Sequence, residues 1–334
     1  MKETFLYAFR AICPILLTIA LGFAVRRMGK WDEKFFKALN QLSFHIFLPA
    51  NLFINIYGIE DLGRMNWPLM LYLLAGVMMS VGLGFVAARL FIPRRDQKGV
   101  LIQACFRSNQ AILGLPVAQA LGGEAAMAFA SLSISLCVPI YNVLAVLILT
   151  CYGSEAEKKV SGRALLKKIV TNPLIIACLA ALLLVLLRQV MAQVSGEQIF
   201  FLRDRLPSLY QAMSSLAKIA SPLMLFTLGT GLDFKETGTL LPQLSLGVGI
   251  RLLVSPAVVI GIALLLKDVL GITSMEIPTL IAVTASPVAV SSAVMVQQMG
   301  GDDQLAGQMV VWSSALSMLS IFLIICVLRS LGAL

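Results

Sequence analysis

Blocks of apolar residues separated by short polar links fill almost the whole chain, and each block is about 20 or more residues long. A helix of about 20 apolar residues crosses the roughly 30 Å hydrocarbon core of a bilayer. The pattern therefore predicts an all-α polytopic membrane protein with ten transmembrane helices. The expected spans are 5–26, 35–57, 68–92, 99–121, 125–151, 171–193, 207–231, 240–266, 275–298 and 305–330.

The fourth block departs from this pattern because it carries polar residues at its centre. Residues 107–110 read RSNQ, and Gly114 and Pro116 follow at once. Polar groups in hydrocarbon are costly, and proline removes a backbone hydrogen bond. Irregular backbone at membrane depth is tolerated where it is buried in protein or lines a watery cavity. We therefore expect this span to be interrupted at such a place.

Composition supports a membrane protein and places its function within the spans. The chain has 334 residues, of which 59% are hydrophobic and 13% charged, and its mean hydropathy is +0.90. No substantial soluble domain remains once the spans are removed. The net charge of +9 would suggest nucleic acid in a soluble protein. Here the positive-inside rule explains it, so we expect the lipid bilayer as a partner and no nucleic acid.

The six cysteines are scattered through apolar spans without CxxC spacing. They are interpreted as small buried hydrophobic residues, with no metal site and no cofactor. The first apolar block has no clear small-residue cleavage site and ends in Arg26 and Arg27, which favours an uncleaved first helix.

Orientation follows from the Lys and Arg residues in the links. The links after spans one, three, five, seven and nine carry 14 of them, against 7 on the other face. The richer face should be cytoplasmic, with both termini outside. The link 153–170 then joins two five-helix halves, 1–152 and 171–334, on the cytoplasmic side.

The two halves resemble each other. Pro49 and Pro222 align, each followed by an LF pair and later by an Asp, and residues 119–124 match 297–302 at a constant offset of 178. Because each half has five spans, an odd number, the halves must have opposite orientations in the membrane. Inverted repeats with interrupted spans at matching positions are typical of secondary transporters, and the interruptions indicate the binding site.

Three segments resemble the auxin efflux carrier family, including its bacterial members: ALNQLSFHIFLPANLF, SNQAILGLP and SPVAVSSAVMVQQMGGD. The resemblance covers essentially the whole chain. It implies a fold like that of sodium/proton antiporters and bile-acid symporters, with spans four and nine broken and crossing at the midplane. It also implies a carrier of organic anions such as malonate, malate or auxin, in a bacterial inner membrane, with a homodimer as a further implication. Arg107 stands where we expect a small or neutral residue in many relatives, which leaves the particular substrate open.

Broken spans leave half-helix N-termini, whose N–H groups and partial positive charge suit a carboxylate. Asn109 and Ser292 are the predicted direct contacts. The expected binding residues are Arg107, Asn109, Gln110, Ser286, Ser291, Ser292 and Asn51, and Gly114, Pro116 and Pro287 are expected to shape the crossover. The alternative is that the serines and Gln110 satisfy backbone groups freed by the prolines.

Five further ionisable residues lie in or at the ends of spans. His45, the one histidine, is a candidate proton carrier or a hydrogen-bonded structural residue, and Lys218 occupies the repeat-related position. Asp61 and Asp233 end spans two and seven and are candidate gate or capping groups. Arg251 would hold a gate, pair with an acid or extend towards an interface.

No acidic pair lies at mid-span, although a strongly coupled antiporter of this fold would usually need one. The coupling ion, H⁺ or Na⁺ or none, therefore stays open, and a cation/proton antiporter or sodium symporter is the alternative carrier. A membrane-embedded enzyme is disfavoured because the chain has no DDxxD, no HExxH and no second histidine. A channel would differ from a carrier by unsaturable flux.

Overall fold

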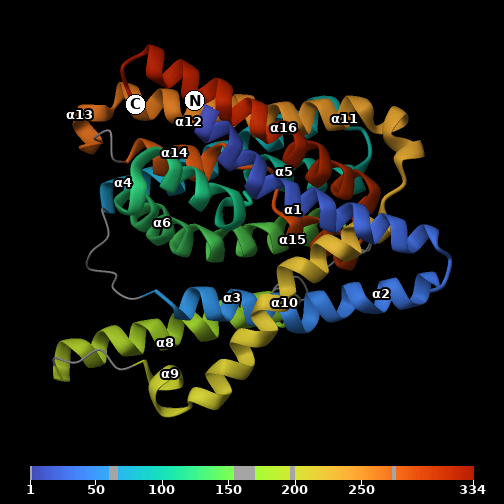
Figure 1. Ribbon diagram of the computed structural model, residues 1–334, viewed down its shortest axis with the longest axis horizontal. Coiled ribbons are helices and arrows are strands. Elements are labelled where there is room, and N and C mark those ends of the chain that lie inside the picture. Colours follow the sequence, from blue (N-terminus) through green and yellow to red (C-terminus); the bar gives the residue numbers. More distant parts are fainter. Residues whose placement is uncertain (1, 60–66, 154–169, 196–199, 273–275) are drawn as a thin grey trace.

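The computed structural model describes residues 2–59, 67–153, 170–195, 200–272 and 276–334. Within these residues the chain is helical and forms no strand, and most of the long helices run along one common direction (Figure 1). The elements are α1 Lys2–Arg27, α2 Glu33–Leu42, η1 Ser43–Phe47, α3 Leu48–Tyr57, α4 Trp67–Phe91, α5 Arg95–Phe106, η2 Gln110–Gly114, α6 Leu115–Tyr152, α8 Pro173–Ser195, α9 Phe201–Arg205, α10 Pro207–Gly231, η4 Phe234–Glu236, α11 Thr237–Gly249, η5 Ile250–Val254, α12 Ser255–Leu265, α13 Lys267–Leu270, α14 Ile277–Thr284, α15 Val290–Met299 and α16 Asp303–Ser330.

The expectation of an all-helical membrane protein is confirmed, because six described stretches are long and apolar enough to cross a bilayer. They are Trp67–Phe91, Gln110–Tyr152, Pro173–Val194, Pro207–Gly231, Thr237–Leu265 and Asp303–Ser330. Each of the ten expected spans also coincides with one or more helices. Ten membrane crossings and an inverted repeat of the two halves stay predictions, and most of the link 153–170 lies outside the described residues.

Gly123 separates the fourth and fifth expected spans within α6. Its backbone has φ 67° and ψ −156°, a region that residues with a side chain rarely adopt. The helix direction therefore changes at this residue, as the expected boundary between 121 and 125 requires.

Three π-helical turns interrupt the described helices, and each ends two residues before a proline. The turns η1, η2 and η5 lead into helices that begin with Pro49, Pro116 and Pro256 at the first or second position. Proline has no N–H, and its ring collides with the carbonyl group four residues earlier in a regular α-helix. The wider π-turn relieves this collision, so the prolines determine where the helices widen.

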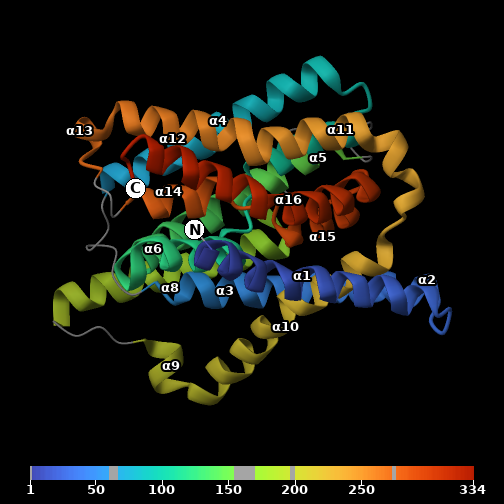
Figure 2. The same ribbon diagram turned by 45° about the horizontal axis from the view of Figure 1, so that its top comes forward.

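The helices form two groups that pack on each other (Figures 1 and 2). In the first, α10 packs on α2, η1 and α3, and α3 packs on α8. We call this the α3–α10 group. In the second, the crossover group, α5 and α6 pack together with α4, α11, α12 and α14–α16. Helix α1 contacts α10 of the first group and α6 and α16 of the second.

Both chain termini lie towards one end of the long helices, on the left in Figure 1. The links that follow α1 and α10 lie at the opposite end, on the right. We call this opposite end the basic end, because the sequence concentrates Lys and Arg in links of this side. That the basic end faces the cytoplasm stays a prediction.

Helices α1 and α10 approach each other closely at two glycines. A Cβ atom added to Gly229 would overlap the backbone of Ile19, and one added to Gly22 would overlap the backbone of Phe226. Glycine at both positions therefore sets the distance between the two helices.

We expect Gly229→Ala to lower the free energy of unfolding by about 1–3 kcal/mol, because the added methyl group forces α1 away from α10. The measurement is thermal unfolding of the purified protein in detergent. Gly261→Ala in α12 is the matched control, since a Cβ there meets open space. Equal melting temperatures for the two variants would contradict this account of the packing.

Candidate functional site

Two interrupted helices meet at the centre of the molecule. Helix α5 ends at Phe106, and α14 ends at Thr284 shortly before Pro287, which has no N–H to continue a helix. Between the interruptions, Ser108 and Val288 form an isolated antiparallel bridge. We call residues 107–109 and 287–289 the crossover. The expected interruption of the fourth and ninth spans is therefore present, and the two breaks lie side by side.

Two backbone hydrogen bonds hold the crossover. The Asn109 N–H donates to the Pro287 carbonyl oxygen at 2.8 Å, and the Ala289 N–H donates to the Arg107 carbonyl oxygen at 3.1 Å. Each break thus satisfies backbone groups that the other break leaves without a helical partner.

Arg251 lies behind the crossover and satisfies the C-terminal carbonyl groups of both broken helices. Its side chain is 2% exposed, and its Nε donates to the Ser286 carbonyl oxygen at 2.8 Å. Its terminal nitrogens donate to the carbonyl oxygens of Cys105, Phe106 and Val283 at 3.2–3.3 Å. A cation at helix C-termini opposes the negative end of each helix dipole.

Two of the roles expected for Arg251, pairing with an acid and extending towards an interface, do not fit this arrangement. The side chain forms no ion pair with an acid among the described residues, and its burial excludes an extension to the interface. The sequence showed a charge in an apolar span but not its partners, which lie 32–146 residues away along the chain.

The helices that begin after the breaks present their N-termini to the crossover, and no side chain of a described residue caps these N-termini as Arg251 caps the C-termini. After the break the chain re-enters helix at Gln110 in η2, and α15 starts at Val290. Neither Asn109 nor Ala289, the residues at these N-cap positions, caps its helix with its side chain. The Val288 N–H is satisfied by the Ser313 hydroxyl at 3.1 Å. The two helix starts therefore present positive dipole ends near one another.

A cavity of about 90 Å³ lies between the crossover and the α3–α10 group. Arg107 is the one charged side chain among its described lining residues. The lining residues are Leu48, Asn51, Leu52, Asn55, Arg107, Ser108, Asn109, Gln110, Ala111, Ile112, Val138, Tyr141, Asn142, Ser221, Met224, Ala289, Val290 and Ser291. Arg107, Asn109, Gln110, Ser291 and Asn51 of the expected binding residues thus share one cavity.

Arg107 is 3% exposed and is held by neutral groups. One terminal nitrogen, Nη2, donates to Asn142 Oδ1 at 2.7 Å and to Ser291 Oγ at 2.9 Å. The other, Nη1, contacts the sulfur of Met295. Among the described residues no carboxylate pairs with Arg107. Its charge is therefore buried without a countercharge from this part of the protein.

Several polar side-chain atoms at the crossover have no hydrogen-bond partner in the described protein. They belong to the Ser108 hydroxyl, the Asn109 amide nitrogen, both amide atoms of Gln110, and the Ser292 hydroxyl. All four side chains are at most 6% exposed. Buried polar atoms are nearly always paired, so four unpaired side chains around one crossover indicate room for a polar ligand or water.

The remaining expected site residues shape the backbone or lie outside the cavity lining. The Ser286 hydroxyl donates to the Ala282 carbonyl oxygen at 2.6 Å, which is the backbone role considered as its alternative. A Cβ on Gly114 would lie 2.5 Å from the same oxygen, so glycine permits the close approach of α14. Pro116 is the second residue of α6, and Pro287 contributes its carbonyl oxygen to the crossover.

Asn51 faces the crossover from the α3–α10 group. Its Nδ2 donates to the Ala217 carbonyl oxygen at 3.0 Å, and its Oδ1 accepts from Asn55 Nδ2 at 3.1 Å. Two amides of α3 therefore lie on the wall opposite Arg107, and Asn55 joins the candidates that the sequence pattern had indicated.

The candidate proton and gate residues lie elsewhere. His45 is exposed, and its Nδ1 lies 2.9 Å from the Gln41 carbonyl oxygen, consistent with a structural hydrogen bond. Lys218 is exposed on α10. Asp233 caps the short helix η4 by accepting from the Lys235 N–H. Asp61 lies outside the described residues.

Asn142 is a residue of this site that the sequence reasoning missed. It is 1% exposed, accepts from Arg107, and donates through Nδ2 to the Val138 carbonyl oxygen. The available signal was an asparagine in the middle of an apolar span, three residues after Pro139. Met295 and Ser313 gave no comparable signal, because methionine and serine are common in apolar helices.

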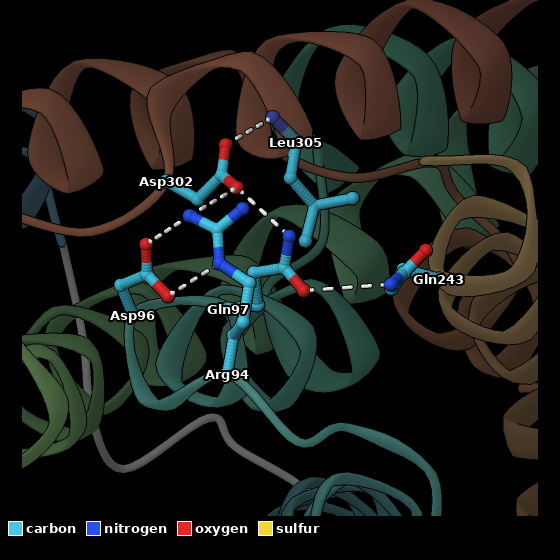
Figure 3. Close-up of polar contacts among 6 residues, drawn as sticks. All are labelled: Arg94, Asp96, Gln97, Gln243, Asp302 and Leu305. Atoms are coloured by element: carbon cyan, nitrogen blue, oxygen red, sulfur yellow. Dashed lines mark hydrogen bonds and ion pairs between the residues drawn. The ribbon is translucent and has the colours of Figure 1, made fainter. Parts of the chain in front are cut away.

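A polar cluster formed by Arg94, Gln97, Gln243 and Asp302 joins α5, α11 and α16 at the basic end (Figure 3). Asp302 accepts from Gln97 at 2.9 Å and from the Leu305 N–H at 2.9 Å, and lies 3.6 Å from Arg94. Gln97 in turn accepts from Gln243 at 3.5 Å. The cluster therefore links helices of the crossover group to one another.

Comparison with known proteins places these features in a wider context. A family model described as membrane transport protein matches residues 7–325. An uncharacterized transporter of Methanocaldococcus jannaschii is 24% identical over 295 residues, covering 84% of this chain and 86% of that protein. An uncharacterized transporter of Methanothermobacter thermautotrophicus is 22% identical over 322 residues, covering 95% of this chain and 97% of that protein. Both relatives are named as transporters, and neither name states a substrate.

We expect Arg251→Met to lower the free energy of unfolding by about 3 kcal/mol or more, because four buried carbonyl groups lose a charged donor. Arg251→Lys should have a free energy of unfolding between those of the wild type and Arg251→Met. An ammonium group keeps the charge but cannot reach all the carbonyl groups that the guanidinium donors reach. Thermal unfolding in detergent measures both effects. Arg329→Met, at an exposed position near the end of α16, is the control. If Arg251→Met and Arg329→Met have equal melting temperatures, the capping role of Arg251 is wrong.

Proposed function

The chain belongs to the membrane transport protein family, that of the auxin efflux carriers, and we propose that it is a secondary carrier of small organic anions. The substrates would be carboxylates that are malonate-like, malate-like or auxin-like. The observation that carries this proposal is Arg107, a buried cation at the cavity with no carboxylate partner among the described residues.

Electrostatics favours an anion in this cavity. Burying a charge away from water is costly unless an opposite charge or several hydrogen bonds compensate it. Asn142 and Ser291 supply only part of this compensation, because both are neutral acceptors. A carboxylate beside Arg107 would supply the missing charge, and the N-termini of η2 and α15 would add favourable dipoles.

The position of the cavity suggests how such an anion would cross the membrane. One wall comes from the crossover and the other from α3 and α10, which belong to the other helix group. A rocking or elevator-like movement of one group against the other would open this boundary on alternate sides. In this mechanism the two halves, 1–152 and 171–334, each contribute one broken helix to the site.

A cation/proton antiporter or a sodium symporter on the same fold is the second candidate. Its site would need carboxylates near the crossover, whereas the described cavity lining contains an arginine and no acid. This favours the anion carrier, with H⁺ or Na⁺ as an additional coupling ion for the test below. We further propose a bacterial inner-membrane location with both termini outside, and a homodimer.

A thermal-shift screen on the purified protein tests the substrate class. Mono- and dicarboxylates are added with and without sodium at two pH values. We expect at least one carboxylate to raise the melting temperature of the wild type but not of Asn109→Ala, whose lost amide is one of the unpaired donors. Gln41→Ala, at an exposed position of α2, is the control. If no carboxylate changes the melting temperature, the anion proposal fails.

Arg107→Gln tests the role of the charge. We expect it to weaken binding of the identified carboxylate about tenfold or more, while a neutral amide analogue is affected much less, because the lost interaction is between opposite charges. Titration calorimetry with both ligands gives the two dissociation constants. Arg89→Gln, at an exposed position of α4, controls for the change in net charge. An equal loss for both ligands would assign Arg107 to structure.

A further inference from the structure

The two sides of the crossover differ in how the helix groups meet. On the side away from the basic end, the groups are separated by the cavity that contains Arg107. On the side towards the basic end, a side-chain contact joins them: Asn40 Nδ2 donates to Gln297 Oε1. We call this contact the amide latch.

Three helical paths place the latch and the cavity on opposite sides of the crossover. On the continuous path from α2 to α3, Asn40 precedes the cavity residue Leu48. On α10, Ser221 lines the cavity, whereas Thr227, further towards the basic end, lies beside the latch. On α15, which starts at the crossover, Gln297 lies about two turns towards the basic end.

The helices around the latch are closely packed. Asn40 is 4% exposed, and the space beside the latch is a cavity of about 30 Å³, against about 90 Å³ at Arg107. Gly307 of α16 lies against the C-terminal end of α10, because a Cβ atom added to it would lie 3.1 Å from Leu232, directly after α10, and 3.2 Å from Leu228. The polar contact of the latch and the apolar contacts of Gly307 with Leu228 and Leu232 therefore close the boundary between the two helix groups on this side.

We propose that the amide latch between Asn40 and Gln297 is the cytoplasmic gate of the carrier and that this structure is its outward-facing conformation. The inference rests on the proposed function, since a gate has meaning only in a carrier. Asn40 belongs to the α3–α10 group and Gln297 to the crossover group, so movement between the groups must break their hydrogen bond. Water that enters then satisfies both amides, because each can donate and accept.

The polar cluster at the same end provides an internal comparison (Figure 3). Gln97 and Gln243 also form an amide pair, but both lie in the crossover group, on α5 and α11. Their bond stays intact when that group moves as a unit. Substitution in this pair should therefore leave the gate closed, whereas substitution in the latch should open it.

Accessibility of a reporter cysteine tests the gate without any substrate. Ser221→Cys places the reporter in the wall of the cavity. The background carries serine at the cysteines that are not buried, Cys13, Cys151 and Cys326. A membrane-impermeant maleimide is applied to right-side-out and to everted vesicles, so that the labelling rate is measured from each side.

We expect the reporter to react faster from the outer side when the latch is intact. Asn40→Ala and Gln297→Ala should each raise the rate from the cytoplasmic side about fivefold, the effect of one lost hydrogen bond on a two-state equilibrium. Gln243→Ala, the matched control, should leave it unchanged. Equal rates from both sides with the latch intact, or the same increase in Gln243→Ala, would overturn the proposal.

A double variant guards against a general loosening of the protein. Asn40→Gln together with Gln297→Asn, in the reporter background, exchanges the two amides and keeps their combined length, so the reporter should label from the cytoplasmic side as slowly as with the intact latch. Fast cytoplasmic labelling of the reporter in this double variant would reject the gate. The outcome is independent of the carboxylate screen: the gate stands if labelling behaves as expected and no carboxylate binds, and it fails if a carboxylate binds but labelling does not change.

Discussion

Two broken helices can meet inside a membrane protein only if the backbone groups at their ends find partners. Arg251 provides partners for the C-terminal ends of both, through hydrogen bonds to carbonyl groups of α5, of α14 and of the segment directly after α14. Two backbone bonds between residues 107–109 and 287–289 connect the breaks directly. The protein itself satisfies the carbonyl groups at the C-terminal ends of the broken helices. The uncompensated positive dipole ends are therefore those of the helix N-termini, and these face the cavity.

The two buried arginines of the crossover group illustrate how the same side chain serves structure in one place and suits a ligand in another. Arg251 donates to four carbonyl oxygens, which lie at the negative ends of helix dipoles. Arg107 donates to neutral side chains and lies near the positive ends of η2 and α15. The helix dipoles therefore stabilise the positive charge of Arg251 and destabilise that of Arg107. An anion in the cavity would interact favourably with both the Arg107 charge and the positive ends of the two helix dipoles.

Local sequence patterns predicted much of this arrangement, and long-range contacts account for what they missed. Polar residues and prolines inside apolar blocks predicted the interruptions at Arg107 and Pro287, because each disrupts a helix on its own. The partners of Arg251 and the contact of Arg107 with Asn142 depend on how distant helices pack, and no pattern within one span encodes that. The π-turns were also missed, although each precedes a proline, since proline predicts a disruption of the helix but not its form.

The chemistry of the contacts at the basic end distinguishes parts that stay together from parts that separate. The cluster around Asp302 combines a largely buried carboxylate with Arg94 and two amides, and breaking it would leave a charge without its partners. Such a cluster suits helices that keep their positions relative to one another. The latch between Asn40 and Gln297 contains no charge, so water replaces its hydrogen bond at little cost once the groups part. A neutral amide pair is thus the kind of contact expected where a carrier must open and close repeatedly.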